Sequence, residues 1–331
     1  GLEFEISDEI QMRTGKPARG LYVPFEVQRA GTRPGAERRD LTVGTATAGG
    51  NMVATNLQPG SFIDLLRNRL IVREAGATML SGLTGSIAIP KQTGSATAYW
   101  VAESGAPTES QQTIGQVTMS PKTVGGFTDF SRLLLLQSTP SVDAMVQNDL
   151  ARVLALAIDL AALHGTGSSN QPTGIAATAG IGSVAGGTNG AAPTWANVVT
   201  LETEVAQDNA DIGALKYVSN AKVRGKLKQT EKATSTAQFV WNGSEMNGYA
   251  TLVSNQVSST LTKGASSGIC SAIFFGNWSD LIIGEWGTLD ILVNPYTGAD
   301  AGTVRVHAFQ SIDIAVRRAE SFAAMLDALT T

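Results

Sequence analysis

The stretch LHGTGSSNQPTGI, residues 163–175, decides how this chain folds, because it closes a long segment rich in alanine and leucine. Glycine is the residue most often found just past the end of a helix. We therefore expect a helix of about 23 residues that stops at Gly165. A short rigid turn should follow, with Gly165, Gly167 and Gly174 as its structural residues. Taken alone, such a turn also fits a phosphate loop or an ordinary helix cap.

The segment before this turn has the pattern of an amphipathic helix. Thr139 suits the cap and Pro140 the first turn, and at 1.5 Å per residue the helix is about 35 Å long. Its apolar stripe is expected to consist of Val142, Met145, Val146, Leu150, Val153, Ala157, Leu160 and Leu163. The polar residues expected to lie largely away from that stripe are Asp143, Gln147, Asn148, Arg152 and Asp159. His164, at the helix end, is favourably placed on the helix dipole.

Two extended runs before the helix predict a β-hairpin. Its arms are read from Ile87, Ile89, Tyr99 and Val101, and from Ile114, Val117, Met119, Val124, Phe127 and Phe130, with a polar turn at 103–110. With about 14 residues per arm, the hairpin would extend over about 40 Å. A lone hairpin is marginal in water, so we expect it to clamp a neighbouring subunit through Tyr99, Trp100, Glu103 and Glu109. The alternative is a hairpin folded back on its own core.

The other segments are less strongly patterned. Residues 1–55 are irregular and indicate an extended arm or a disordered tail; Arg19 and Arg29 in it, and Arg152 on the helix, are candidates for subunit contacts. The remaining pattern predicts a helix at 62–70, a loose linker at 176–192, a helix at 194–209, a strand at 216–219, a basic helix at 220–229, strands near 249–255 and 273–275, a turn-rich break at 296–302 and a strand pair at 303–318.

Composition narrows the class of protein. The 331 residues suffice for two or three lobes. Only 16% of them are charged, which suits a subunit that buries surface against its own copies. The net charge of −4 gives no sign of strong free-standing nucleic-acid binding. A single cysteine, Cys270, and two histidines, His164 and His307, leave little for disulfides, metal sites or general-base catalysis. No apolar run is long enough to cross a bilayer.

Three further segments help to decide between the alternatives for the turn at 165–174. They are NGYATLVSN at 247–255, IFFGNWSDLIIG at 273–284 and VRVHAFQSIDIAVRR at 304–318. The order and spacing of these segments, and of the helix end and turn at 163–175, resemble those of the major capsid proteins of tailed bacteriophages, which have the Hong Kong 97-like fold. The second segment carries Asn277 where aspartate is usual in that family. The resemblance covers roughly residues 55–325.

The resemblance implies an α+β fold made of six parts. These are an N-terminal arm (1–55), the start of a peripheral domain (56–84), an extended β-hairpin loop (85–131), the peripheral domain with its long spine helix (132–189), an axial domain (190–290) and a return to the peripheral domain (291–331). It also implies a non-enzymatic virion subunit without cofactor or metal, assembled in the host bacterial cytoplasm. Its partners would be copies of itself in pentamers and hexamers, packaged double-stranded DNA by non-specific contact, portal proteins and decoration proteins, with no membrane. Gly1 would be a processed end.

Single motifs give only weak support for a more specific chemical function. The loop at 164–169 lacks the lysine of a Walker loop and follows a helix rather than a strand. Ser168 and Ser169 lack a nucleophile elbow. Glu202 and Glu204 point to different sides of a helix, which favours a solvated face over an acid/base pair. The basic residues at 222–228 suit a solvated or intersubunit face, or a DNA-facing patch. The alternatives for the whole chain are an encapsulin-like nanocompartment shell protein and a hydrolase of novel type.

Overall fold

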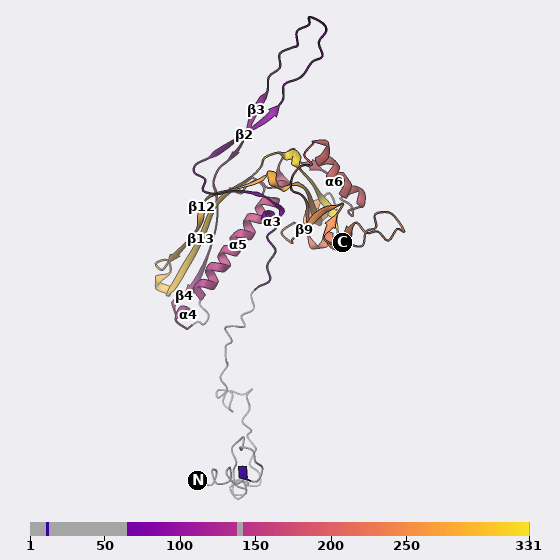
Figure 1. Cartoon of the computed structure of the whole chain (residues 1–331). Coiled ribbons are helices and arrows are strands. Elements are labelled where there is room, and N and C mark those ends of the chain that lie inside the picture. Colours follow the sequence, from indigo (N-terminus) through magenta and orange to yellow (C-terminus); the bar gives the residue numbers. More distant parts are fainter. Residues whose placement is uncertain (1–10, 13–64, 138–141, 331) are drawn as a thin grey trace. The chain divides into compact units, whose positions relative to one another are not determined.

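The computed structural model describes residues 11–12, 65–137 and 142–330. The chain divides into two compact units, Gly1–Phe62 and Ile63–Thr331, and every element named below belongs to the second (Figure 1). The predicted arm at 1–55, with Arg19 and Arg29, and the predicted helix start at Thr139 and Pro140 lie outside the described residues. Residues 65–70 form no helix, so the helix predicted at 62–70 is wrong for that part.

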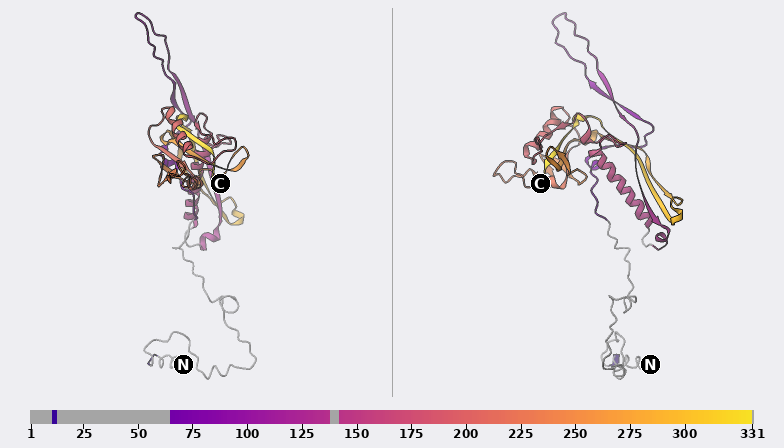
Figure 2. Two further views of the ribbon diagram at one scale, coloured as in Figure 1. Left: turned by 90° about the vertical axis from the view of Figure 1, so that its right-hand side faces the viewer. Right: turned by 180° about the vertical axis from the view of Figure 1, so that it is seen from behind.

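A four-stranded sheet and a long helix form one part of the unit. The strands are β1 (Thr78–Leu80), β12 (Leu281–Asn294), β13 (Thr303–Val316) and β4 (Lys122–Ser131), in the order β1-β12-β13-β4. β1 runs parallel to β12, and the other pairs are antiparallel. Helix α5 (Val142–His164) lies along the sheet, as the views from two sides show (Figures 1 and 2). The expected strand pair at 303–318 is one strand, β13.

The face of α5 that packs on the sheet differs in part from the expected stripe. Val142, Val146, Leu150 and Leu154, at intervals of four residues, join Phe130, Val304, Val306 and Ala308 in one apolar cluster. Met145, Val153 and Leu160 were expected in the stripe but are 39%, 45% and 41% exposed. Apolar residues occur nearly all round this helix, so periodicity alone could not choose the buried side. The predicted length and end of the helix are confirmed.

The predicted hairpin exists, but it is shorter than expected. β2 (Ile87–Gly94) pairs antiparallel with β3 (Thr113–Met119), from Ile87 opposite Met119 to Gly94 opposite Thr113. The following strand, β4, pairs with β13 instead, so the expectation that the second arm continues to Phe130 is wrong. The break falls at Pro121, which has no N–H for a ladder. Beside it, Asp313 accepts hydrogen bonds from the backbone of Ser120 (2.9 Å) and from Lys122 (3.1 Å).

A second, larger sheet forms the other part of the unit. Its order is β5-β14-β11-β6-β9-β8-β7, and β10 also pairs with β11. The bounds are β5 Gly182–Ser183, β6 Leu215–Ser219, β7 Trp241–Asn242, β8 Glu245–Met246, β9 Tyr249–Val253, β10 Leu261–Lys263, β11 Ser266–Asn277 and β14 Phe322–Leu329. The strands predicted at 216–219, 249–255 and 273–275 correspond to β6, β9 and β11.

Helices cover the larger sheet. On one face α6 (Trp195–Gln207) and α7 (Ala221–Leu227) share an apolar cluster with β6, β11 and β14. A second cluster joins the end of α5 and α3 (Val72–Ala75) to the same strands. Thr194 caps α6 with a capping box that includes Asn197, so the helix predicted at 194–209 is confirmed. The other short helices are α4 Arg132–Gln137, η4 Ile175–Ala177, η5 Trp278–Asp280, η6 Ala299–Ala301 and η7 Ala319–Ser321.

The segment at 176–192 is tied down, so its description as a loose linker is wrong. Its strand β5 pairs with β14. The buried carboxylate of Asp327 accepts the N–H of Gly186 at 2.9 and 3.0 Å, and the carbonyl of Ala191 accepts the N–H of Leu329 at 2.9 Å. Small residues here allow the chain to follow the edge of a sheet closely.

The two sheets are joined by two strand crossings. β11 passes into β12 through η5, and β13 passes into β14 through η7. Asp280 in the first link accepts a hydrogen bond from the hydroxyl of Ser321 in the second, at 2.6 Å. Trp278 and Phe322 meet edge to face at the same place, with ring centroids 5.6 Å apart.

Candidate functional site

The turn that ends α5 is a miniature hairpin. Gly174 donates its N–H to the carbonyl of Gly165 (2.9 Å), and Thr166 faces Thr173 as an antiparallel bridge. At its tip Gln171 donates to the carbonyl of Ser168 at 2.9 Å. The two residues between them, Ser169 and Asn170, have φ of 52° and 60°. Positive φ at both central residues is the mark of a type I′ turn, whose twist suits a two-residue hairpin.

The three predicted turn glycines serve two purposes. A Cβ on Gly165 would lie 2.3 Å from the carbonyl oxygen of Pro172, and one on Gly174 would lie 2.5 Å from that of Ala161. Gly167 has φ +72°, a conformation that favours glycine. Close backbone approach therefore requires two of the glycines, and backbone conformation favours the third.

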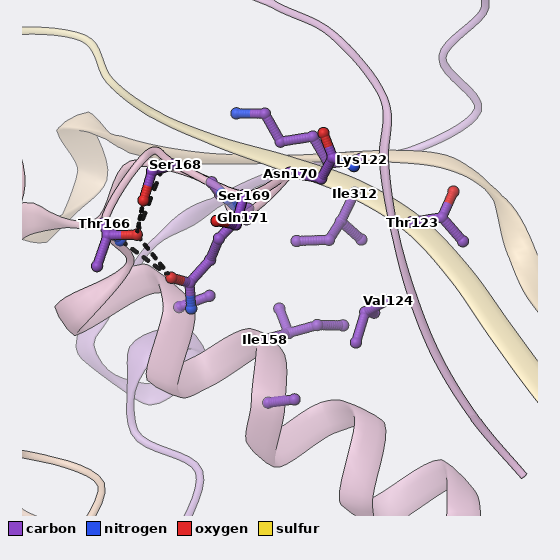
Figure 3. Close-up of a pocket in the computed structure, with 13 residues that line it drawn as sticks. Lys122, Thr123, Val124, Ile158, Thr166, Ser168, Ser169, Asn170, Gln171 and Ile312 are labelled. Atoms are coloured by element: carbon purple, nitrogen blue, oxygen red, sulfur yellow. Dashed lines mark hydrogen bonds between the residues drawn. The ribbon is translucent and has the colours of Figure 1, made fainter.

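A pocket of about 680 Å³ opens between this turn, α5, β4 and β13 (Figure 3). Ile158, Val124 and Ile312 form an apolar floor, and hydroxyl and amide groups of the turn form the rim. On the rim, Thr166 Oγ1 lies 2.8 Å from Ser168 Oγ and donates to Gln171 Oε1 at 3.1 Å. Lys122 at the other side is paired with Asp313 at 3.1 Å. An apolar floor with a few polar groups around it is the usual composition of a ligand-binding pocket.

His164 is half-buried at the end of α5, where its imidazole makes specific contacts and does not lie free in solvent near the end of the helix dipole. Its Nε2 accepts the N–H of Ser258 at 2.9 Å, and Phe274 meets the ring edge to face at 5.4 Å. Burial lowers the pKa of His164 to about 4. The imidazole is therefore neutral, with its proton on Nδ1, because removal from water outweighs the attraction of the dipole.

This gives a pH-dependent stability. The unfolded chain binds a proton at His164 below pH about 6.5 that the folded chain does not bind until about pH 4. Stability is therefore full above the unfolded pKa and falls as pH drops towards the folded one. Between pH 7.5 and 5 this residue should cost the wild-type chain about 2 kcal/mol of unfolding free energy. His164→Gln should lack that component, which denaturant titration of the unassembled chain would measure. His307→Gln is the control; equal pH dependence in wild type and His164→Gln would contradict the assignment.

The hairpin tip carries four of the predicted contact residues, and it is uncovered. Every residue from 95 to 109 is exposed; Tyr99 is 49% exposed and Trp100 is fully exposed. The hydroxyl of Ser110 bridges the tip by accepting from the N–H of Thr97 (2.8 Å) and donating to its carbonyl (3.2 Å). Glu103 and Glu109 lie on the same exposed segment. The structure does not fold this tip back on its own core. Contact with a neighbour through these residues stays a prediction.

Arg152 is exposed on α5, at a pocket of about 410 Å³ that it lines with Leu65 and Arg67. Arg67 forms an ion pair with Asp149 on the same helix. The predicted contact residue Arg152 therefore lies beside the segment that contains Leu65 and Arg67, and that segment contacts α5. A role for Arg152 between subunits stays a prediction.

Sequence reasoning missed Asp159, which it placed away from the buried side. The carboxylate is 5% exposed and accepts the N–H groups of Ile71 (3.2 Å) and Val72 (2.9 Å), where α3 begins. Burial raises its pKa, and these hydrogen bonds oppose the rise. The available signal was a lone acid inside the apolar run LALAIDLAALH.

Glu202 and Glu204, the two carboxylates weighed as an acid/base pair, do not form one. Glu202 accepts hydrogen bonds from the hydroxyl of Tyr249 (2.9 Å) and from Asn247, and the hydrogen bond to Glu202 raises the pKa of Tyr249. Its bonds are thus to a neighbouring strand and turn, and they do not involve Glu204. Within residues 65–137 and 142–330, no three His, Cys, Asp or Glu side chains are grouped so that they could hold a metal ion. None of the helices in those ranges has the length and apolar character needed to span a bilayer.

A family model described as "Phage capsid family" matches residues 49–326. The chain belongs to the phage capsid family. Among curated phage capsid proteins, the major capsid protein of Halomonas phage phiHAP-1 is 33% identical over 322 residues, which are 97% of this chain and 50% of that protein. The major capsid protein of Klebsiella oxytoca phage phiKO2 is 26% identical over 139 residues, 42% of this chain and 32% of that protein. The chain thus spans half or less of the length of these curated relatives.

Solved phage capsid structures show the same fold. A structure described as the capsid of a native GTA particle has a TM-score of 0.70 at 19% identity, covering 86% of this chain and 99% of that one. A structure of Gordonia phage Cozz has a TM-score of 0.65 at 15% identity, covering 89% and 97%. The predicted Hong Kong 97-like α+β fold is confirmed.

Proposed function

We propose that this chain is a major capsid protein that self-assembles into the icosahedral shell around double-stranded phage DNA. The observation that carries this proposal is the family match over residues 49–326, accompanied by a fold close to that of solved capsid subunits. Its partners would be other copies in pentamers and hexamers, packaged DNA through non-specific contacts, portal proteins and decoration proteins. Assembly would take place in the cytoplasm of the bacterial host, and the product is the virion capsid.

We keep the six-part division of labour for this function, with one changed boundary. Residues 1–55 would serve as an arm, 56–84, 132–189 and 291–331 as the peripheral domain, and 190–290 as the axial domain. We predicted the extended loop at 85–131. The free hairpin contains only β2, β3 and the residues between them, because β4 pairs with β13 in the four-stranded sheet. The fully exposed Trp100 supports a loop that meets a neighbouring subunit. The relatives named above are capsid proteins, so a nanocompartment shell is not favoured.

Expression of the chain and electron microscopy of the product tests this function. We expect closed shells that sediment far faster than the free 34.4 kDa subunit. A species that stays monomeric at all concentrations would contradict the proposal. Nuclease-protected DNA inside shells made during infection, as opposed to a cargo enzyme, would separate a phage capsid from a nanocompartment.

A further inference from the structure

The surface of α7 carries the most concentrated positive charge in the described part of the chain. Four cations, Lys222, Arg224, Lys226 and Lys228, fall within seven residues, whereas the whole chain has a net charge of −4. Lys222, Arg224 and Lys228 are exposed, and Lys226 is half-buried. We call these four residues the basic ridge. No acidic residue occurs between Asp211 and Glu231, so neighbouring residues in the sequence do not neutralise this positive charge.

The helix itself is fixed by contacts that leave the ridge outside. Val223 and Leu227 are fully buried in the apolar cluster beneath α7, and Asn220 caps its first turn by accepting the N–H of Val223 at 2.9 Å. At 100° per residue, Lys222 and Lys226 flank the buried side on one edge, and Arg224 and Lys228 on the other. Gly225 lies between them on the outer crest, where an added Cβ would meet nothing within 4 Å.

The ridge is electrostatically unfavourable within the chain. Lys222 with Lys226, and Arg224 with Lys228, are like-charge pairs four residues apart, which destabilise a helix. Lys222 also stands in the first turn, where the helix dipole disfavours a cation. None of the ion pairs in the described part of the chain involves the four ridge residues. The dipole favours Arg224, Lys226 and Lys228 at the end of the helix but not Lys222, and it does not remove the repulsion within the two like-charge pairs.

We propose that the basic ridge is the surface through which the subunit contacts the phosphate backbone of double-stranded DNA. Four cations along the two edges of a short helix, with an uncovered glycine crest between them, let a phosphate chain approach closely. The four ridge residues are all cations that suit phosphate oxygens, and none is an aromatic side chain, so we expect a contact that is independent of sequence. This inference rests on the proposed capsid function, because it names the surface by which the shell would contact its DNA.

The test uses the unassembled full chain and two unrelated 30-base-pair duplexes as probes. Binding is measured at several KCl concentrations for wild type and for Lys222→Gln/Arg224→Gln/Lys228→Gln. Glutamine has a similar helix propensity, so α7 should persist, and circular dichroism checks this. The control, Arg73→Gln/Lys263→Gln/Arg318→Gln, removes the same charge from exposed positions on other elements.

We expect equal binding of both duplexes by wild type. We expect the slope of log K against log salt to fall by about 2 to 3 in the ridge variant, and by less than about 1 in the control. Shells of the ridge variant should form normally and protect less DNA.

Equal slopes for the ridge variant and the control would overturn the inference. Failure of the ridge variant to close shells, with DNA binding unchanged, would identify the ridge as a contact between copies and overturn it as well. Wild-type binding is measured without assembly, so absence of shells in wild type would count against the capsid function alone.

Discussion

Replacing residues 95–112 by Asn-Gly will leave a folded, soluble subunit that no longer forms closed shells. The ladder of the hairpin ends at Gly94 opposite Thr113, after a register shift between Gln92 and Gly94, and a two-residue type I′ turn can close it there. All residues from 95 to 109 are exposed, and their removal takes away no core contact. What is lost is the uncovered surface of Tyr99 and Trp100, which only a neighbour can bury.

Single substitutions at Trp100 give a graded version of the same test. Trp100→Ala should weaken assembly by about 2 kcal/mol per subunit if the side chain anchors an interface. Trp100→Phe retains most of the apolar area and should recover much of that loss. Circular dichroism checks the fold of each variant, and sedimentation with electron microscopy measures assembly. Normal shells from the loop replacement would show that the hairpin tip is dispensable.

Gly174→Ala should destabilise the subunit by about 3 kcal/mol, because the new methyl group would overlap backbone atoms. It would lie 2.5 Å from the carbonyl oxygen of Ala161 and 2.6 Å from the nitrogen of Gly165. These two atoms form the hydrogen bond that ends α5, in which the N–H of Gly165 donates to the carbonyl of Ala161 at 2.9 Å, so neither can move far without breaking it.

Gly225→Ala is the matched control. That position is helical, has open space around it and lies outside the turn. Alanine there should stabilise the subunit by about 0.5 to 1 kcal/mol. Denaturant unfolding of the unassembled chain measures both variants. A Gly174→Ala chain as stable as wild type would mean that the turn is more open than the structure shows.

Local signals in the sequence were sufficient for much of the fold. The glycine at 165 marked the end of α5, and the helix predicted at 194–209 corresponds to α6, because helix ends and apolar periodicity depend on residues close together in sequence. The strand predicted at 273–275 lies within β11, and its three residues are buried in the core. Such local features predicted the positions of helices and strands without knowledge of the segments on which these elements pack.

Features that depend on distant residues could not be predicted. β4 alternates equally well as a hairpin arm or as a partner of β13, which lies about 180 residues further along the chain; only the pairing decides. His164 is neutral because Ser258 and Phe274 enclose it. Asp159 is buried because the backbone of Ile71 and Val72 needs an acceptor. In each case the environment comes from segments remote in sequence.

The paired strand crossings between the two sheets have a mechanical consequence. A single flexible linker would let one part of the subunit swing, but two adjacent strands crossing together resist both bending and twisting. The hydrogen bond between Asp280 and Ser321 and the edge-to-face rings of Trp278 and Phe322 fasten the two crossings to each other. Load applied at one sheet is therefore transmitted to the other as in a rigid bracket. In a particle under outward pressure, we expect deformation to concentrate in the slender hairpin and not at this joint.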